Sequence, residues 1–342
     1  MGFQRFLRHE TTLIILVVIT LGVLLTLWVL LGNQFFSLNN FQSMGYQIPE
    51  FGFLALAMAV TMLTGGIDLS VVANANLAGI LAAFVLTRRL GFLTSYPDAG
   101  VVVIACLVAL AVASIAGFIN GLLISKLSVP PILATLGTMT FYNGISMAIT
   151  SGEGIVGFPE MFLKIGSEHI ANIPLIFLLF VLASIVVGFM LEQTSTGVSV
   201  YLYGENKIAS MFAGLRNENL IVRVYFLSGL LAGFASIIMI SRFNSAKVGY
   251  GDTYLLQAIL VSVLGGIAPE GGRGRIIGVV LGIFILQALQ SAFTLFAFTP
   301  YAKKLIWGSM LLLVMVINFL VEHWRLRTRN PALNKDTAAS SP

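Results

Sequence analysis

The sequence predicts an all-α integral membrane protein with about ten transmembrane helices. Three observations support this: 58% of the 342 residues are hydrophobic, only 10% are charged, and long apolar runs recur along the chain. Ordinary soluble domains carry about 25% charged residues, and a spanning helix needs about 20 mostly apolar residues. A soluble fold of this size could not bury so much apolar surface, so soluble enzymes and binding proteins are excluded.

Ten apolar runs are the candidate spans. They cover residues 12–32, 49–65, 69–87, 99–123, 131–151, 173–191, 221–241, 254–268, 276–296 and 302–321. The first run is too long for a signal peptide and no small-residue cleavage pattern follows it, so we expect an uncleaved span. Gly65 and Gly66 break the helix between the second and third runs. The eighth run is short and ends in a glycine cluster, which is typical of a half-helix.

The basic residues predict the orientation. With ten spans both termini lie on one side, and with the N-terminus inside, 12 of the 19 Lys and Arg fall on cytoplasmic segments and 7 on outer ones. This agrees with the positive-inside rule. The long loop 152–172 then lies outside and the loop 192–220 inside. We expect one transmembrane domain over residues 1–321 and a cytoplasmic tail over 322–342.

Two pairs of segments look alike. The stretch "ALAMAVTMLTGGIDLS" at 55–70 resembles "LQAILVSVLGGIAPEG" at 256–271, and Pro130 followed by Gly137 resembles Pro300 followed by Gly308. We predict a repeat of spans 2–5 in spans 7–10. An offset of five spans reverses the direction across the membrane, so the repeat would be an inverted one, as in many transporters.

The chain lacks the groups that most chemistry needs. Between their ends the ten runs contain no Asp, Glu, Lys, Arg or His, which disfavours ion-coupled transport, although backbone carbonyls alone could hold sodium. No G-x-x-x-x-G-K-[ST] phosphate loop occurs, and the single Cys106 makes neither an intrachain disulfide nor a metal site. The net charge of +5 is scattered, so nucleic acid is not an expected partner. We expect no enzymatic activity, metal or cofactor in this chain.

One segment of the inner loop predicts a short amphipathic helix: "YGENKIASMFAGLRNENL" at 203–220. Asn206 is a suitable N-cap, and Gly214 a suitable residue just after the helix. Ile208, Met211 and Phe212 recur at i, i+3 and i+4 and form one apolar stripe. Such a helix could enter a groove on a partner protein, lie on the bilayer interface, or pack against the protein itself.

Five segments in order are similar to the ribose-type permeases of ABC importers. They are "GGIDLSV" at 65–71, "FINGLLISKLSVPPILATLGTMTFYNGI" at 118–145, "GENKIASMFAGL" at 204–215, "YFLSGLLAGFASI" at 225–237 and "VLGGIAPEGGRGRIIGVVLG" at 263–282. The resemblance covers roughly residues 45–320. It implies a multi-pass subunit in the bacterial cytoplasmic (inner) membrane, moving a pentose, a hexose, autoinducer-2 or a similar neutral solute.

The resemblance also implies partners. A second permease, identical or homologous, would complete the pathway. Two ABC ATP-binding subunits, or one fused duplicated subunit, would bind ATP and Mg²⁺, and a periplasmic or extracellular solute-binding protein would deliver the solute. The family's coupling loop matches this chain at Gly204, Asn206, Ala209 and Gly214. The residues expected to contact the ATP-binding subunit are Gly204, Glu205, Asn206, Lys207, Ile208, Ala209, Met211, Phe212 and Gly214.

This chain departs from the family pattern at three places. Val72 and Ala73 follow the aspartate motif where Gly-Ser is usual, Gln257 lies near the position of a common acidic residue, and Lys207 replaces a common proline. The first two departures touch the expected solute path or its gate. The sequence therefore leaves the identity of the sugar open.

Asp68 belongs to a helix-junction or gate motif formed by Gly65, Gly66, Asp68 and Ser70. Its carboxylate could accept N–H groups at the start of the next helix, serve a gate or subunit contact, or bind solute. The candidate path residues are Asn74, Asn76, Asn120, Thr138, Tyr142, Asn143 and Gln257, each of which could instead make a helix–helix hydrogen bond. We expect alternating-access import of a neutral sugar or sugar-like solute, driven by separate ATPase subunits. The alternative is an ion-coupled carrier or a passive channel for a polar neutral solute.

Overall fold

A computed structural model describes the backbone of residues 2–89, 91 and 96–329, and the side chains of residues 13–89, 91 and 96–316. The chain divides into two compact units, Met1–Phe298 and Thr299–Pro342. Each is described by itself. Within the described residues the fold is helical apart from short two-residue strands, as the sequence predicts.

Unit 1 contains the helices α1 to α12. They are α1 (Gly2–Leu31), the 3-10 helix η1 (Gly32–Gln34), α2 (Leu38–Met62), α3 (Val71–Leu86), α4 (Asp98–Ser125), α5 (Pro131–Thr150), α6 (Glu160–Ser167), α7 (Leu175–Gln193), α8 (Ser195–Glu205), α9 (Lys207–Phe212), α10 (Asn217–Phe243), α11 (Asp252–Leu264) and α12 (Ile276–Leu295). The strands β1 (Ile155–Val156) and β4 (Ser245–Ala246) pair antiparallel, as do β2 (His169–Ile170) and β3 (Ile173–Pro174).

Unit 2 contains α13 (Pro300–Arg329). The helix continues past residue 321, where the sequence predicts the end of the transmembrane domain. Polar residues can extend a helix beyond its apolar part, so the end of an apolar run does not mark the end of the helix. The predicted division into a transmembrane domain over 1–321 and a tail over 322–342 stays a prediction. The rest of the predicted tail, residues 330–342, lies outside the described residues.

Every predicted apolar run overlaps a helix, but not every helix could cross a bilayer by itself. Six segments of the described residues are long and apolar enough: Leu13–Gln34, Asp98–Ser125, Pro131–Thr150, Leu175–Gln193, Asn217–Phe243 and Ile276–Leu295. The helices α3 and α11 are apolar but shorter, and α2 carries Gln47 and Glu50 within its length. The fold class is confirmed, whereas the number of ten spans is not.

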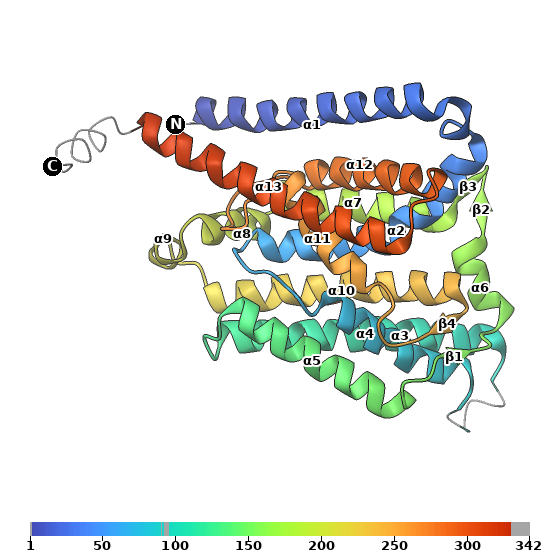
Figure 1. The fold of residues 1–342 in the computed structure, drawn as a ribbon. Helices are drawn as coiled ribbons and strands as arrows, with labels where there is room; N and C mark the ends of the chain where they lie inside the picture. The colour runs from blue at the N-terminus through green and yellow to red at the C-terminus, as the bar shows by residue number, and fades with distance from the viewer. Residues whose placement is uncertain (1, 90, 92–95, 330–342) are drawn as a thin grey trace. The chain divides into compact units, whose positions relative to one another are not determined.

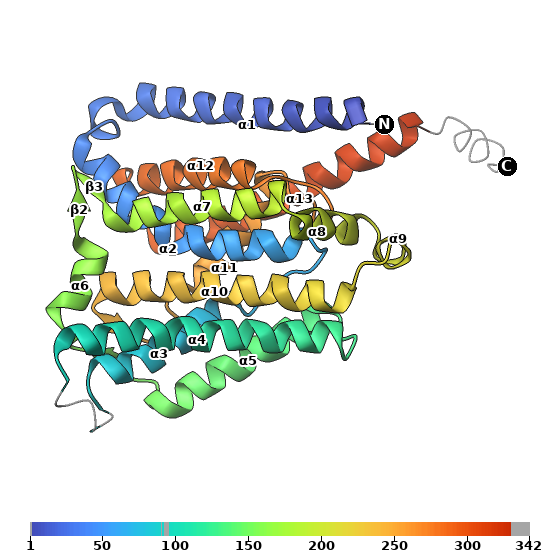
Figure 2. The same cartoon turned by 180° about the vertical axis from the view of Figure 1, so that it is seen from behind.

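The buried helix α10 packs against α4, α2 and α3 (Figures 1 and 2). Glycines permit the contact between α10 and α4. A Cβ on Gly117 would lie 2.2 Å from the carbonyl oxygen of Tyr225, and one on Gly229 would lie 2.3 Å from that of Ala113. Such close approach of two backbones is typical of membrane helix pairs.

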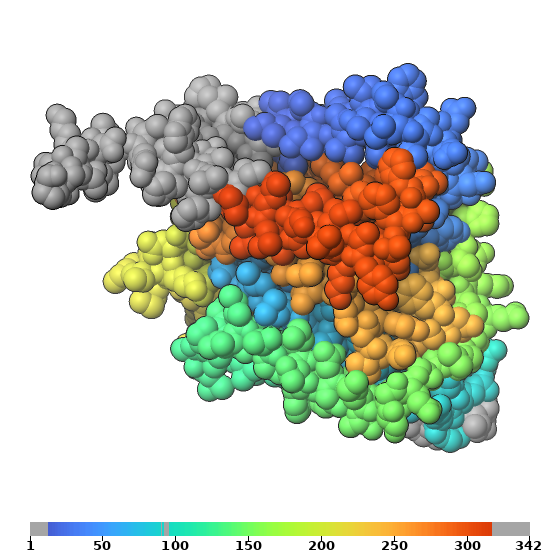
Figure 3. Space-filling model, viewed as in Figure 1, coloured from blue at the N-terminus to red at the C-terminus, as the bar shows by residue number. Residues whose placement is uncertain are grey.

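The two long loops lie at opposite ends of unit 1. Figures 1 and 2 place α9 of the loop 192–220 at one end and α6 of the loop 152–172 at the other. Figure 3 shows the segment around α9 projecting beyond the neighbouring helices. This arrangement agrees with loops on opposite sides of a membrane. Which side is cytoplasmic stays a prediction.

The two similar GG segments meet in space. A Cβ on Gly65 would lie 2.7 Å from the carbonyl oxygen of Glu270, and one on Gly271 would lie 2.5 Å from the Gly65 nitrogen. The helices α2 and α11 therefore end at the same end of unit 1. An inverted repeat would place equivalent turns at opposite ends, so this pair of segments does not support the predicted inversion.

Candidate functional site

The predicted amphipathic helix is confirmed as α9. Asn206 caps its start, because its Oδ1 accepts the backbone N–H groups of Ile208 and Ala209, each at 2.9 Å. The chain leaves the helix through Gly214, whose φ of 82° is a left-handed conformation that glycine adopts at little cost. The Asn206 side chain thus fixes the start of α9 and the Gly214 backbone permits its end. The helix itself is too short to be stable alone.

The apolar stripe of α9 points away from unit 1. Ile208 is 66% exposed, Met211 60% and Phe212 83%. Of the three alternatives open from the sequence, packing against the protein's own surface is therefore wrong. A groove on a partner protein or the bilayer interface remains for these side chains.

Two polar side chains attach α9 to the start of α10. Nδ2 of Asn217 donates to the Lys207 carbonyl oxygen at 3.1 Å, and the Ser210 hydroxyl donates to Oδ1 of Asn217 at 3.1 Å. Asn217 was not predicted from the sequence, although an asparagine follows the helix closely there. A force on α9 therefore acts directly on the first turn of α10.

A contact without side chains attaches the end of α8 to the end of α2 and to the segment between α11 and α12. A Cβ on Gly204 would lie 2.1 Å from the Leu63 carbonyl oxygen and 2.3 Å from the Gly272 nitrogen. The Gly272 N–H donates to that same Leu63 oxygen at 2.8 Å. Together with the Gly65–Gly271 approach, these residues form a glycine junction (Gly65, Gly204, Gly271 and Gly272).

Two further side chains connect α8 to the turn before α12. The Tyr201 hydroxyl donates to the Gly274 carbonyl oxygen at 3.0 Å. Burial raises the pKa of Tyr201 to about 12, with the charge of Glu192 adding to the effect, so the phenol keeps its proton at neutral pH. Glu205 pairs with Arg273 at 3.3 Å on the surface.

Asp68 is buried between α2 and α3, with 1% of its surface exposed. Its Oδ1 accepts the backbone N–H of Ser70 at 3.0 Å and the Ser70 hydroxyl at 2.7 Å, and its Oδ2 accepts the Ser228 hydroxyl at 3.1 Å. These three donors offset the cost of burying the carboxylate. The bond to Ser70 N–H agrees with the helix-start explanation, but the bond to α10 goes beyond it.

The junction motif also contacts α4 and α5. Nδ2 of Asn120 donates to the Ser70 hydroxyl oxygen at 2.7 Å, and Oγ1 of Thr135 lies 3.0 Å from the Ile67 carbonyl oxygen. Gly65 thus belongs to the glycine junction while Asp68, a few residues later, is bonded to α10. The glycine junction and the surroundings of Asp68 therefore form one continuous region.

Three of the seven candidate path residues, Asn74, Asn120 and Tyr142, bond to a neighbouring helix or turn. Nδ2 of Asn74 donates to the Ala113 carbonyl oxygen and the Tyr142 hydroxyl to that of Ala116, both at 3.0 Å. Thr138 bonds within α5, Asn76 and Gln257 are buried, and Oδ1 of Asn143 is buried without a hydrogen-bond partner among the described residues. The cavity beside Asn76 measures about 10 Å³, room for one water at most. Lining of a solute path by these residues stays a prediction.

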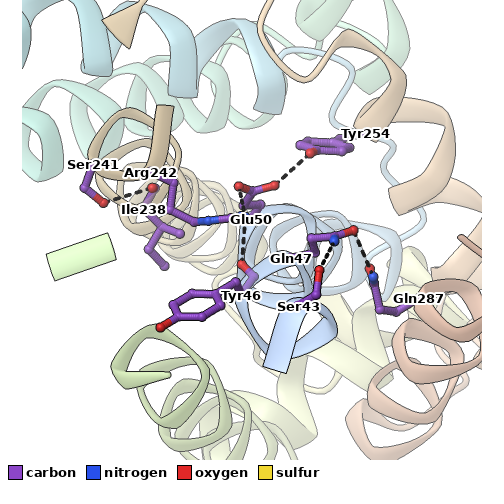
Figure 4. Close-up of polar contacts among 9 residues, drawn as sticks. All are labelled: Ser43, Tyr46, Gln47, Glu50, Ile238, Ser241, Arg242, Tyr254 and Gln287. Carbon is purple, nitrogen blue, oxygen red and sulfur yellow. Dashed lines mark hydrogen bonds and ion pairs between the residues drawn. The ribbon is translucent and has the colours of Figure 1, made fainter. Parts of the chain in front are cut away.

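The sequence analysis missed a buried ion pair (Figure 4). Glu50, 3% exposed, lies in the middle of α2. Nη1 of Arg242, at the end of α10, donates to Oε1 of Glu50 and to the Tyr46 carbonyl oxygen, and the Tyr254 hydroxyl donates to Oε2 of Glu50 at 2.9 Å. Glu50 is at the end of the predicted run 49–65 but in the middle of the longer helix α2, so the absence of ionisable groups between the ends of the runs does not extend to the whole helix.

The difference lies in the start of the helix. Pro49 suits the first turn of a helix, and the predicted span began there, which placed Glu50 at its end. In the structure α2 begins at Leu38, after Ser37, whose side chain accepts the Asn40 N–H at 3.3 Å. Ser37 was the available signal, because serine is a preferred N-cap.

Comparisons with known proteins agree on a transport function. Residues 40–315 match the family described as branched-chain amino acid transport system / permease component. The chain is 32% identical over 300 residues to the ribose import permease protein of Bacillus subtilis (strain 168), covering 87% of this chain and 90% of that protein. It is also 32% identical over 298 residues to the autoinducer 2 import system permease protein of Yersinia pestis (strain Pestoides F), covering 86% and 82%. No solved structure matches.

Proposed function

This chain belongs to the ribose-type permeases of ABC importers, within the family of branched-chain amino acid transport permease components, and from that premise we propose its role in detail. It is the membrane-spanning subunit of a binding-protein-dependent importer. Its cargo is a neutral sugar or sugar-like solute of the pentose, hexose or autoinducer-2 type. The names of its relatives, a ribose and an autoinducer 2 permease, support this cargo class.

The exposed stripe of α9 is the observation that carries the proposal. Phe212 and Met211 are large apolar side chains at the tip of a capped helix that projects from unit 1. Such a helix is suited to a groove on a separate ATP-binding subunit. Two of these subunits, or one fused duplicated subunit, would serve this chain and a second permease. ATP and Mg²⁺ would bind to them.

Movement of α9 would reach the core by two routes. Asn217 links α9 to α10, which carries the Ser228 that bonds to Asp68. Gly204 links the end of α8 to the glycine junction, a few residues before Asp68. An ATP-driven displacement of α9 would therefore shift α10 and the α2–α3 junction together, as alternating access requires.

In this proposal the α9 end faces the cytoplasm and both termini are cytoplasmic. The ten predicted runs all cross or enter the membrane, with α3 and α11 as short elements inside the protein. The opposite end, with α6, receives the solute-binding protein. Lys126, Arg216, Arg223, Arg273 and Arg275 then lie on the cytoplasmic side, as the positive-inside rule expects.

The test places a charge on the stripe. Met211→Glu and Phe212→Glu should leave the fold intact, because both side chains are exposed, but should abolish ATP-driven uptake and co-purification of the ATP-binding subunit. Phe212→Leu is the matched control and should retain both. Normal uptake by the charged variants would refute the docking role.

A second experiment separates the alternative function. The purified chain is placed in liposomes without ATP or other subunits, and uptake of labelled ribose and related sugars is measured. We expect none. Uptake under these conditions would indicate a passive channel or an ion-coupled carrier instead, and a dependence on a sodium or proton gradient would distinguish those two.

A further inference from the structure

A cavity lies between α8 and the start of α10, apart from the exposed stripe of α9. Its volume is about 220 Å³. The hydroxyl-bearing residues Ser195, Thr196 and Ser199 line one side, and Arg216 and Arg223 line the other. The volume and the donors suit a compact group with several acceptor oxygens.

The two arginines give this cavity a positive charge. Among the residues that the structure describes, Arg216 and Arg223 form no ion pair, and the nearby Glu218 pairs with Lys126 at 3.1 Å. Guanidinium groups donate two parallel hydrogen bonds to a phosphate, and hydroxyls can donate further ones. The cavity also lies at the first turn of α8, where the helix end favours an anion.

The position of the cavity relates it to the membrane surface. The candidate span α7 ends at Gln193, just before α8, and the candidate span α10 begins at Asn217. The cavity therefore lies where two spans leave the bilayer. On α8, Val198 is 54% exposed and Leu202 48%, so apolar side chains lie next to the hydroxyls, as in helices at the lipid interface.

From these observations we propose that the cavity between α8 and α10 binds the phosphate group of an anionic membrane lipid. Arg216 and Arg223 hold the phosphate oxygens, and the hydroxyls of Ser195 and Thr196 complete the donor set. The Ser199 hydroxyl donates to the Ser195 carbonyl oxygen at 2.8 Å and lines the same side. The acyl chains lie along Val198 and Leu202. A bound lipid holds the first turns of α8 against the start of α10. The inference needs only that α7 and α10 span the membrane, and so stands apart from the choice of cargo.

The test compares lipid retention in the assembled complex. Wild type and the Arg216→Gln/Arg223→Gln variant are analysed by native mass spectrometry with phosphatidylglycerol and with phosphatidylcholine. Each basic residue contributes about fivefold to the affinity for an anionic lipid, so the double variant should bind phosphatidylglycerol about 25-fold more weakly. Phosphatidylcholine retention should be low in both. Lys164→Gln/Lys247→Gln, which removes the same charge from the opposite end of unit 1, should leave phosphatidylglycerol retention unchanged.

A second arm distinguishes lipid from free anion. The complex in phosphatidylcholine nanodiscs is titrated with inorganic phosphate and its thermal stability is followed. Arginine-dependent stabilisation by phosphate without preferential retention of phosphatidylglycerol would overturn the lipid assignment. Undiminished phosphatidylglycerol retention by the double variant would overturn the site. If the double variant lost the ATP-binding subunit but kept its phosphatidylglycerol, the cavity would be a protein contact and the lipid site would also be overturned. ATP-driven uptake by the same samples tests the proposed function separately.

Discussion

Removing Glu50 and removing Arg242 should destabilise the protein by different amounts, because the two side chains are buried to different extents. The side chain of Glu50 is 4% exposed and that of Arg242 is 23% exposed. Removing one partner of a buried pair costs about 3–5 kcal/mol of unfolding free energy, because the other charge stays buried without compensation. Glu50→Leu leaves the more exposed arginine, which also keeps the Tyr46 carbonyl oxygen, so we expect about 3 kcal/mol.

The reverse change should cost more. Arg242→Leu leaves the buried carboxylate of Glu50 with the Tyr254 hydroxyl as its one donor among the described residues, so we expect a loss of about 5 kcal/mol. The double variant Glu50→Leu/Arg242→Leu replaces the pair with apolar side chains and should lie closer to wild type than either single variant. With single losses of about 3 and about 5 kcal/mol and a double loss below about 3 kcal/mol, the expected coupling energy is more than about 5 kcal/mol, because each single loss includes the cost of leaving the other charge unpaired.

Denaturant unfolding of the purified chain in detergent, followed by circular dichroism, measures these differences. The exposed pair Glu205–Arg273 is the matched control, because its side chains are 36% and 63% exposed. Replacing either of its members with leucine should change the unfolding free energy by less than about 1 kcal/mol. Additive losses in the Glu50 and Arg242 variants, or single losses as small as those of the control, would show that the buried pair contributes no specific stabilisation.

Three further predictions concern the α9 end. Gly204→Ala should separate the backbones of the glycine junction at a cost of about 1–3 kcal/mol, and uptake per ATP hydrolysed should fall while the complex still assembles; an unchanged ratio would contradict the transmission route. Asn206→Ala should remove two cap bonds worth about 0.5–2 kcal/mol and speed amide exchange over residues 207–212, whereas Asn206→Ser should not; equal exchange in both would deny the cap. Asp68→Asn keeps the oxygen that bonds to Ser70, so uptake should fall less than about tenfold, by less than about 1.4 kcal/mol; abolished uptake in an assembled complex would show that the charge itself is required.

The helix class and the α9 segment could be predicted because they depend on local signals. Apolar runs identify helices in a membrane protein, since each helix must satisfy its own backbone. The cap of α9 is encoded in one asparagine and one glycine, Asn206 and Gly214, a few residues apart. These features require no knowledge of which helices are neighbours.

The parts that could not be predicted depend on residues far apart in the sequence. The partner of Glu50 is Arg242, on another helix, and the partner of Asp68 on α10 is Ser228. Hydropathy places each residue along the membrane normal but not beside a particular neighbour. The similarity between the segments 55–70 and 256–271 did not reveal their relative direction either, because similar apolar segments can run in the same direction.

The glycine junction has a mechanical consequence. Where side chains separate two segments, a push is partly absorbed by rotamer changes; where the Gly204 Cα lies directly against the Leu63 carbonyl and the Gly272 amide, there is no side chain to yield. Compact protein interiors are hardly compressible. The end of α8 and the end of α2 should therefore move as one rigid body. A displacement of α9 should then reach the backbone beside Asp68 with little loss of amplitude.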